Sequence, residues 1–264
     1  MNVSVFQDYE ELSKNTAEWI IAYVNKHPHA VLSFPGGHTP ARTYQHLVQA
    51  VHEGRVDFGQ ASFIGLDEWV GLGREDDGSC QHFMYHEFFI PAGVAQSQIH
   101  FFNAQAADLA AECREIDEVI MNLGGINFIL LGVGVNGHLG FNEPGVSFDT
   151  YSHVIDLDDD TKRVGQKYFA EQKQLSQGIT LGMKHIMDAD TIMVLANGLH
   201  KSEVVKQLLA GPVTNTLPAS IVHNHSDAYM MMDSAAYSQV SSSNGASQGM
   251  TADSINKYTD NSVR

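Results

Sequence analysis

The sequence is poor in cysteine, in basic residues and in long apolar runs. Its two cysteines, Cys80 and Cys113, have no spacing typical of a metal site or a redox pair, so we expect reduced thiols and no disulfide. The 15 basic residues face 31 acidic ones, a net charge of −16, which argues against nucleic acid and anionic membranes as main partners. An anionic ligand would therefore need local backbone N–H groups and a few placed lysines.

No apolar run approaches the roughly 20 residues that span a membrane. The first residues also lack a basic region followed by an apolar stretch, so we expect a cytoplasmic protein without membrane association. With 264 residues, 43% of them hydrophobic, the chain is long enough to bury a sizeable core.

Short apolar runs rich in β-forming residues alternate with segments of helical periodicity. Strands buried on both faces are expected at Val3–Phe6, Ala30–Phe34, Ala61–Leu66, Asn127–Leu131, Thr191–Ala196 and Ala228–Met232. Helices are expected at Tyr9–Asn25, Thr39–Val51, Ala107–Asn122, Asp160–Glu171 and His200–Leu209, with a short helical piece around Gln81–Phe89. Strands alternating with helices indicate parallel βαβ units in an α/β fold.

No internal repeat or low-complexity linker divides the chain, so we expect one domain over residues 1–237. Residues 238–264 are polar and nearly free of large apolar side chains. Such a segment cannot bury enough surface to offset its ordering entropy, which predicts a flexible C-terminal tail.

The segment Leu131–Gly145, LGVGVNGHLGFNEPG, is a glycine-rich loop that directly follows a predicted strand. It would deliver Asn136, His138 and Glu143 to the ligand crevice at the carboxyl ends of the strands. The alternative is a strand-to-helix turn with an N-cap and a hydrogen-bonded core histidine.

The segment SFPGGHTPARTY has the features of a phosphate site. Gly36 and Gly37 follow a strand and let the main chain approach an anion, while Thr39 and Pro40 begin a helix whose N-terminus carries partial positive charge. The segment is neither a Walker loop nor a dinucleotide fingerprint. A purely structural Gly-Gly turn is the alternative.

The segment GLDEWVGL places Asp67 and Glu68 side by side at the end of a predicted strand. Neighbouring strand residues point to opposite faces, so the two acids cannot share a role, and Asp67 is the better candidate for a general base. The alternative is an N-cap and a solvated acid.

Lys201, at a glycine-containing strand-to-helix turn, and Lys167 are candidates to clamp a phosphate, although lysine is usually a solvated surface residue. His82 and His86 have HxxxH spacing, but Phe83 stands where a zinc protease helix needs its glutamate, and no third ligand follows. We predict no metal site.

Taken together, PGGHTP, GLDEW and GVGVNGHLGFNEPG, in this order and separation, resemble the glucosamine-6-phosphate deaminase family of amino-sugar phosphate isomerases over Val3 to Asp233. The related 6-phosphogluconolactonases keep the glycine-rich GH portion but do not continue with FNEPG. The resemblance implies a single Rossmann-like α/β domain with a mostly parallel sheet. It also implies conversion of a 2-amino-2-deoxyhexose 6-phosphate, of gluco or galacto configuration, to a ketohexose 6-phosphate and ammonia without metal or organic cofactor.

The resemblance further implies that Asp67 takes the substrate proton, that His138 assists ring opening and that Glu143 orients this histidine. Asn136 stands where some members carry an aspartate that completes the relay, and an asparagine cannot stabilise imidazolium by charge. The phosphate would be held by Gly36, Gly37, His38, Thr39, Lys167 and Lys201.

Four further positions depart from the family pattern. His38 replaces a smaller residue, which affects the expected sugar preference, and Lys167 replaces an arginine, which loses bidentate geometry. His153 and Ile155 stand where allosteric members carry basic residues, so activation by an acetylated amino-sugar phosphate is not expected.

A sugar-phosphate lactonase and a non-catalytic sugar-phosphate sensor are the alternative functions. The expected partner is a small amino-sugar phosphate, and a homo-oligomer is possible.

Overall fold

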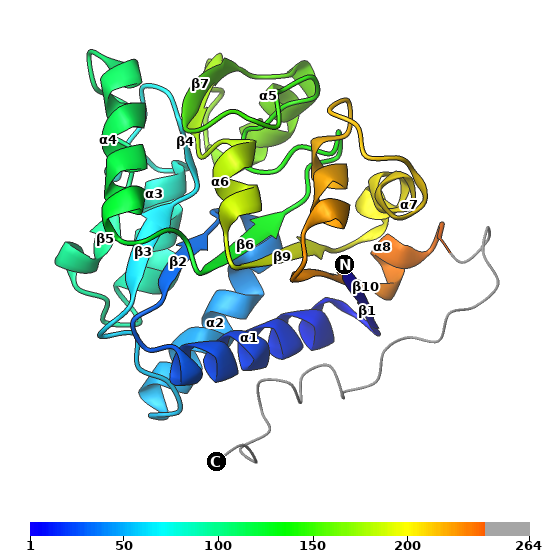
Figure 1. Cartoon of the computed structure of the whole chain (residues 1–264), viewed down its shortest axis with the longest axis horizontal. Helices are drawn as coiled ribbons and strands as arrows, with labels where there is room; N and C mark the ends of the chain where they lie inside the picture. The colour runs from blue at the N-terminus through cyan, green and yellow to red at the C-terminus, as the bar shows by residue number, and fades with distance from the viewer. Residues whose placement is uncertain (241–264) are drawn as a thin grey trace.

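The computed structural model describes residues 1–240. Seven strands form a central sheet in which every paired neighbour runs parallel, in the order β1-β10-β9-β6-β2-β3-β5 (Figure 1). The strands are β1 (Asn2–Phe6), β2 (Val31–Phe34), β3 (Ser62–Gly65), β5 (Ile99–His100), β6 (Phe128–Gly132), β9 (Thr191–Ala196) and β10 (Ala228–Asp233). This arrangement confirms the predicted α/β fold with a mostly parallel sheet.

Helices cover both faces of this sheet, as Figure 1 shows, with α1 and α2 on one side and α4, α6 and α7 on the other. The α-helices are α1 (Tyr9–Lys26), α2 (His38–His52), α3 (Cys80–Met84), α4 (Leu109–Asn122), α5 (Asp159–Gly165), α6 (Met183–Asp188), α7 (Ser202–Ala210) and α8 (Ser234–Tyr237). A π-helical turn, Tyr85–Phe89, continues α3, and short 3-10 turns lie at Gln96–Gln98, Gln166–Tyr168, Leu199–Lys201 and Pro218–Asn224.

The buried strands divide their side chains between two cores. In β6, Phe128 and Leu130 pack with α1 and α2, whereas Ile129 and Leu131 pack with α4, α6 and α7. Side chains alternate between the two faces of a strand, so a strand covered on both faces must be apolar throughout. This requirement explains the uninterrupted apolar runs in the sequence.

A second sheet of three antiparallel strands adjoins the carboxyl edge of the first. It contains β4 (Asp67–Trp69), β8 (Gln177–Thr180) and β7 (His153–Asp156), in that order. The N–H of Leu181, just after β8, donates to the carbonyl of Leu66 at 2.8 Å, which joins this sheet to the end of β3. A small cluster of Trp69, Phe141 and Leu157 forms its apolar core.

All six predicted strands and four of the five long predicted helices are present, with ends within two residues of expectation. The exception is the predicted helix Asp160–Glu171. It is wrong in its second half, because the α-helix ends at Gly165 and only a 3-10 turn, Gln166–Tyr168, follows. Glycine is a poor helix former, and this one packs closely against Trp69.

Four short strands, β4, β5, β7 and β8, were not predicted from the sequence. They have two to four residues, and β7 is only partly buried, so they leave no apolar run. The predicted tail lies mostly outside the described residues. Of its first three residues, Gln239 donates a hydrogen bond to Ser202 at 2.9 Å.

Candidate active site

A cavity of about 670 Å³ opens at the carboxyl edge of the central sheet. Its walls come from the segments that follow β2, β3, β6 and β9 and from the region of α5. Ligands of open α/β sheets bind at this edge, and the volume suits a small metabolite. Eight of the predicted site residues line the cavity: Gly36, Gly37, His38, Thr39, Asp67, His138, Lys167 and Lys201.

Asp67 begins β4, immediately after β3, and its side chain lines the cavity although the residue is only 8% exposed. Burial raises the pKa of its carboxyl to about 6, while a hydrogen bond from the Cys80 thiol and the charge of His138 act in the opposite direction. A carboxylate with a pKa near neutrality can both accept and return a proton. Asp67 therefore has the properties of a general base.

The neighbouring Glu68 points away from the cavity and is fully buried. Its carboxylate accepts backbone N–H bonds from Trp69 at 2.8 Å, Cys80 at 3.0 Å and Gln81 at 2.8 Å. Burial raises its pKa to about 7 despite these bonds. Glu68 is therefore not a solvated acid. It anchors the start of α3 to β4, and this contact holds Cys80 beside Asp67.

His138 lies in the loop after β6, and its imidazole is held at one nitrogen. Nδ1 lies 3.3 Å from Glu143 Oε2 and 3.1 Å from the hydroxyl of Thr161, at the start of α5. Among residues 1–240, Nε2 has no hydrogen-bond partner, so this nitrogen is open to a ligand in the cavity. Thr161 was missed by the sequence analysis, because a lone threonine after a long loop carries no signal of its partner.

Asn136 and Glu143 do not line the cavity but lie behind His138. The amide of Asn136 donates to Glu143 at 2.9 Å, and its side-chain oxygen accepts the His138 backbone N–H at 3.3 Å. The pKa of Glu143 lies below its ordinary value. Burial acts to raise it, but the hydrogen bond and charge of His138 and the hydrogen bonds of Thr161 and Asn136 together outweigh burial. Glu143 is therefore an anion that orients the imidazole, and Asn136 orients Glu143.

Gly134 lets the His138 ring fold back onto the loop. A Cβ at this position would lie 2.5 Å from both Cδ2 and Nε2 of the imidazole, closer than real contacts allow. Any larger residue at position 134 would displace the imidazole of His138, so this position requires glycine.

The N-terminus of α2 also lines the cavity. Gly37 is the N-cap, has a positive φ of 109° and supplies no side-chain cap, so the first N–H groups of the helix are not satisfied by a capping side chain. Such a terminus is an anion site. His38 and Thr39 line the cavity from this turn.

Two lysines, Lys167 and Lys201, line the same cavity. Lys201 donates to the carbonyl of Val133 at 2.7 Å, and burial, helped by the charge of Lys167, lowers its pKa to about 8. Burial also lowers the pKa of Lys167. Two partly desolvated cations in a chain of net charge −16 indicate a site for an anion.

Tyr168 is a further cavity residue that the sequence analysis did not identify. Its hydroxyl would lie 2.9 Å from a Cβ on Gly37, its ring lies 5.0 Å from the His38 ring, and the Lys167 ammonium lies 5.0 Å above it. Burial raises its pKa to about 12, so the hydroxyl stays protonated. Tyr168 thus closes the cavity over the start of α2.

Residues 1–240 contain no group of three His, Cys, Asp or Glu side chains arranged to hold a metal ion. His82 and His86 line the cavity wall with their rings 4.3 Å apart. Cys80 and Cys113 are both free thiols. In this same part of the chain, no helix combines the length and apolar content that crossing a bilayer requires.

Known proteins resemble the chain over nearly its whole length. Residues 7–231 match the family model described as glucosamine-6-phosphate isomerases/6-phosphogluconolactonase. A glucosamine-6-phosphate deaminase of Thermoanaerobacter sp. (strain X514) is 35% identical over 241 residues, which cover 91% of this chain and 95% of the relative. One from Bacillus velezensis is 37% identical over 237 residues, 89% of this chain and 98% of the relative.

Solved structures agree with these sequence matches. A monomeric glucosamine-6-phosphate deaminase superposes with a TM-score of 0.88 at 35% identity, over 90% of this chain and 99% of that one. A 6-phosphogluconolactonase from Leishmania guyanensis shares the fold, with a TM-score of 0.70 at 20% identity over 89% and 97% of the two chains. The chain therefore belongs to the glucosamine-6-phosphate isomerase/6-phosphogluconolactonase family.

Proposed function

We propose that the chain converts glucosamine 6-phosphate and water into fructose 6-phosphate and ammonia. One observation carries the proposal: Asp67 and His138 line the same cavity as a helix N-terminus and two lysines. Relatives from Lachnoclostridium phytofermentans, Bacillus velezensis and Clostridium novyi that are 33–37% identical bear the name of this deaminase, whereas 6-phosphogluconolactonase structures from Leishmania guyanensis and Trypanosoma brucei are 20% and 19% identical. The protein is an enzyme of the deaminase branch.

The reaction begins with the cyclic sugar. His138 moves a proton at the ring oxygen, which opens the pyranose and exposes the C1 aldehyde. Asp67 then removes the proton from C2. The electron pair of that C–H bond forms the C1=C2 double bond of an enolamine, while the C1=O π bond breaks and O1 takes up a proton from water. Asp67 returns a proton to C1, which leaves an iminium at C2. Water adds to C2 and ammonia leaves, so that C2 becomes the ketone.

The assigned roles agree with the environment of each group. Asp67 must reach both C1 and C2, which a short carboxylate above one face of the open chain can do. His138 keeps Nε2 open while Glu143 and Thr161 hold Nδ1, so the ring can transfer a proton without turning.

The phosphate is proposed to bind at the N-terminus of α2, between Gly36, Gly37, His38 and Thr39 on one side and Lys167 and Lys201 on the other. This binding energy is remote from the reacting carbons and can orient them over Asp67. Lys167 contributes charge without the paired donors of an arginine.

Ammonia release tests the proposed function. The protein should release one ammonia per fructose 6-phosphate formed from glucosamine 6-phosphate, and galactosamine 6-phosphate measured in parallel would show whether the epimer is also accepted. Hydrolysis of a 6-phosphogluconolactone without ammonia release from either amino sugar would favour the lactonase. Saturable binding of hexosamine phosphates with no turnover would favour the sensor.

Removing the Lys201 ammonium should weaken phosphate binding. We expect Lys201→Ala to raise KM for glucosamine 6-phosphate by about 30-fold, with kcat within about threefold, because a charge-assisted hydrogen bond to a remote group is lost. The matched control is Lys206→Ala on α7, which directly follows Lys201; the Lys206 side chain is 43% exposed, and KM should not change in this variant. Steady-state kinetics check both, and a fall in kcat alone would contradict the assignment.

The pKa values of Asp67, about 6, and of Lys201, about 8, predict a bell-shaped pH profile of kcat/KM. Below the first value Asp67 takes up a proton and stops acting as a base. Above the second Lys201 loses its charge. In Lys201→Arg the basic limb should move upward, because a guanidinium stays charged. A basic limb unchanged in this variant would show that another group causes it.

A further inference from the structure

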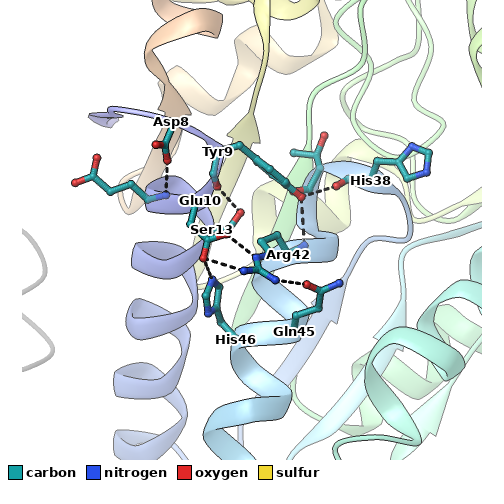
Figure 2. A network of polar contacts seen from close by, with 10 residues as sticks. Asp8, Tyr9, Glu10, Ser13, His38, Arg42, Gln45 and His46 are labelled. Carbon is teal, nitrogen blue, oxygen red and sulfur yellow. Dashed lines mark hydrogen bonds and ion pairs between the residues drawn. The ribbon is translucent and has the colours of Figure 1, made fainter.

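The first turns of α1 and α2 are joined through the hydroxyl of Tyr9. This hydroxyl lies 2.7 Å from the carbonyl oxygen of His38 and 3.0 Å from that of Thr39, and it accepts the backbone N–H of Arg42 at 3.2 Å. Figure 2 shows the tyrosine reaching from α1 to the start of α2. A side chain of one helix thus completes the hydrogen bonding of another helix's first turn.

Tyr9 contacts two backbone groups in the first turn of α2, the carbonyl of His38 and the N–H of Arg42. In an α-helix the N–H of residue 42 pairs with the carbonyl of residue 38, and here the hydroxyl contacts both partners. Partial burial raises the pKa of Tyr9, so it remains a donor throughout the neutral range. The hydroxyl therefore acts as a permanent donor and acceptor at the helix start.

Two charged contacts brace the same junction. Arg42 makes a two-pronged contact with Glu10, at 2.6 and 3.1 Å, and His46 Nε2 lies 3.0 Å from the same carboxylate (Figure 2). The side chains of Arg42 and Glu10 are about half exposed, and such surface pairs contribute little energy each. Their position keeps Tyr9 in register with the first turn of α2.

The planarity of the peptide bond carries the effect of Tyr9 into the cavity. The carbonyl of His38 and the N–H of Thr39 belong to one rigid unit and point in opposite directions, so holding the carbonyl toward α1 aims the N–H away from it. The next unit has no N–H, because residue 40 is proline. The orientation of the Thr39 N–H is thus controlled from outside the cavity.

We propose that Tyr9 is a positioning residue for the substrate phosphate and acts through the Thr39 N–H without contacting the ligand. Tyr9 does not line the cavity. This inference rests on the proposed phosphate site at the start of α2. It assigns to α1 a part in substrate binding that no motif in the sequence indicates.

The test is Tyr9→Phe, with Tyr23→Phe as the matched control. Tyr23 lies on the same helix and donates its hydroxyl to the carbonyl of Asn127 at 3.0 Å, at the opposite edge of the sheet. For Tyr9→Phe we expect KM for glucosamine 6-phosphate to rise about fivefold with kcat within about twofold, since a neutral hydrogen bond is lost. The inhibition constant of inorganic phosphate should rise by the same factor, and turnover of unphosphorylated glucosamine should not change. Tyr23→Phe should alter none of these values.

Glu10→Gln is a second variant, in which Tyr9 itself is not substituted. It weakens the contacts that brace Tyr9 and should raise KM by a smaller factor than Tyr9→Phe. The inference is overturned if Tyr9→Phe leaves KM and phosphate inhibition unchanged while Lys201→Ala raises both. It is also overturned if the variant lowers turnover of glucosamine and of its phosphate equally. If Lys201→Ala also leaves KM unchanged, the proposed phosphate site itself is wrong.

Discussion

Asp67→Asn should lower kcat for glucosamine 6-phosphate by about 10³-fold while the inhibition constant of inorganic phosphate stays near the wild-type value. The amide has nearly the shape of the carboxylate but cannot accept the C2 proton. The phosphate end of the cavity is formed by other segments, so ligand binding there should survive. Turnover and phosphate inhibition measured on the same preparation test both statements.

The same substitution should stabilise the protein. Burial raises the pKa of Asp67 from 3.8 to about 6, so above pH 6 the folded protein holds a carboxylate that burial disfavours. Asp67→Asn should therefore raise the free energy of unfolding at neutral pH by up to about 3 kcal/mol. The gain should disappear as the pH falls toward 4, where the wild-type carboxyl is protonated in the folded state. Denaturant unfolding at two pH values measures it.

A matched control for this variant is Asp227→Asn. Asp227 lies just before β10, at the opposite edge of the sheet, and accepts hydrogen bonds from Thr191 and Tyr229. Its substitution should leave kcat unchanged and cannot produce the stabilisation expected for Asp67. Full activity in Asp67→Asn would end the assignment of Asp67 as the base.

His138→Gln should lower kcat/KM for cyclic glucosamine 6-phosphate by about 10²-fold, because glutamine can hydrogen-bond but cannot transfer a proton at neutral pH. An analogue whose 4- and 5-hydroxyls are both replaced by hydrogen can form neither a furanose nor a pyranose ring and needs no ring opening. Its turnover should fall by only a small factor in the variant. Steady-state kinetics with the two substrates measure the ratio.

His185→Gln is the matched control for this experiment. His185 is also buried beside a carboxylate, with Nε2 2.6 Å from Asp117, but it lies outside the cavity. Any loss in this control should be the same for the cyclic substrate and the analogue. An equal loss on both substrates in His138→Gln itself would refute the ring-opening role.

The fold could be predicted from local patterns because each central strand is buried on both faces. This burial forces continuous apolar runs such as Thr191–Ala196, and these runs are visible without any knowledge of their partners. The antiparallel strands β7 and β8 pair far along the chain and need no such run, so their formation depends on contacts that no local window contains.

The candidate site divides in the same way. Asp67 and His138 could be named from the chain alone, because each stands in a short segment with its own chemical signature. The contacts of Thr161 with His138, of Tyr168 with Gly37 and of Tyr9 with His38 could not be foreseen. Each joins residues 23 or more positions apart, whose closeness results from how separate helices pack on the sheet. Local composition shows which residues are able to do chemistry, and packing between distant segments determines which of them meet.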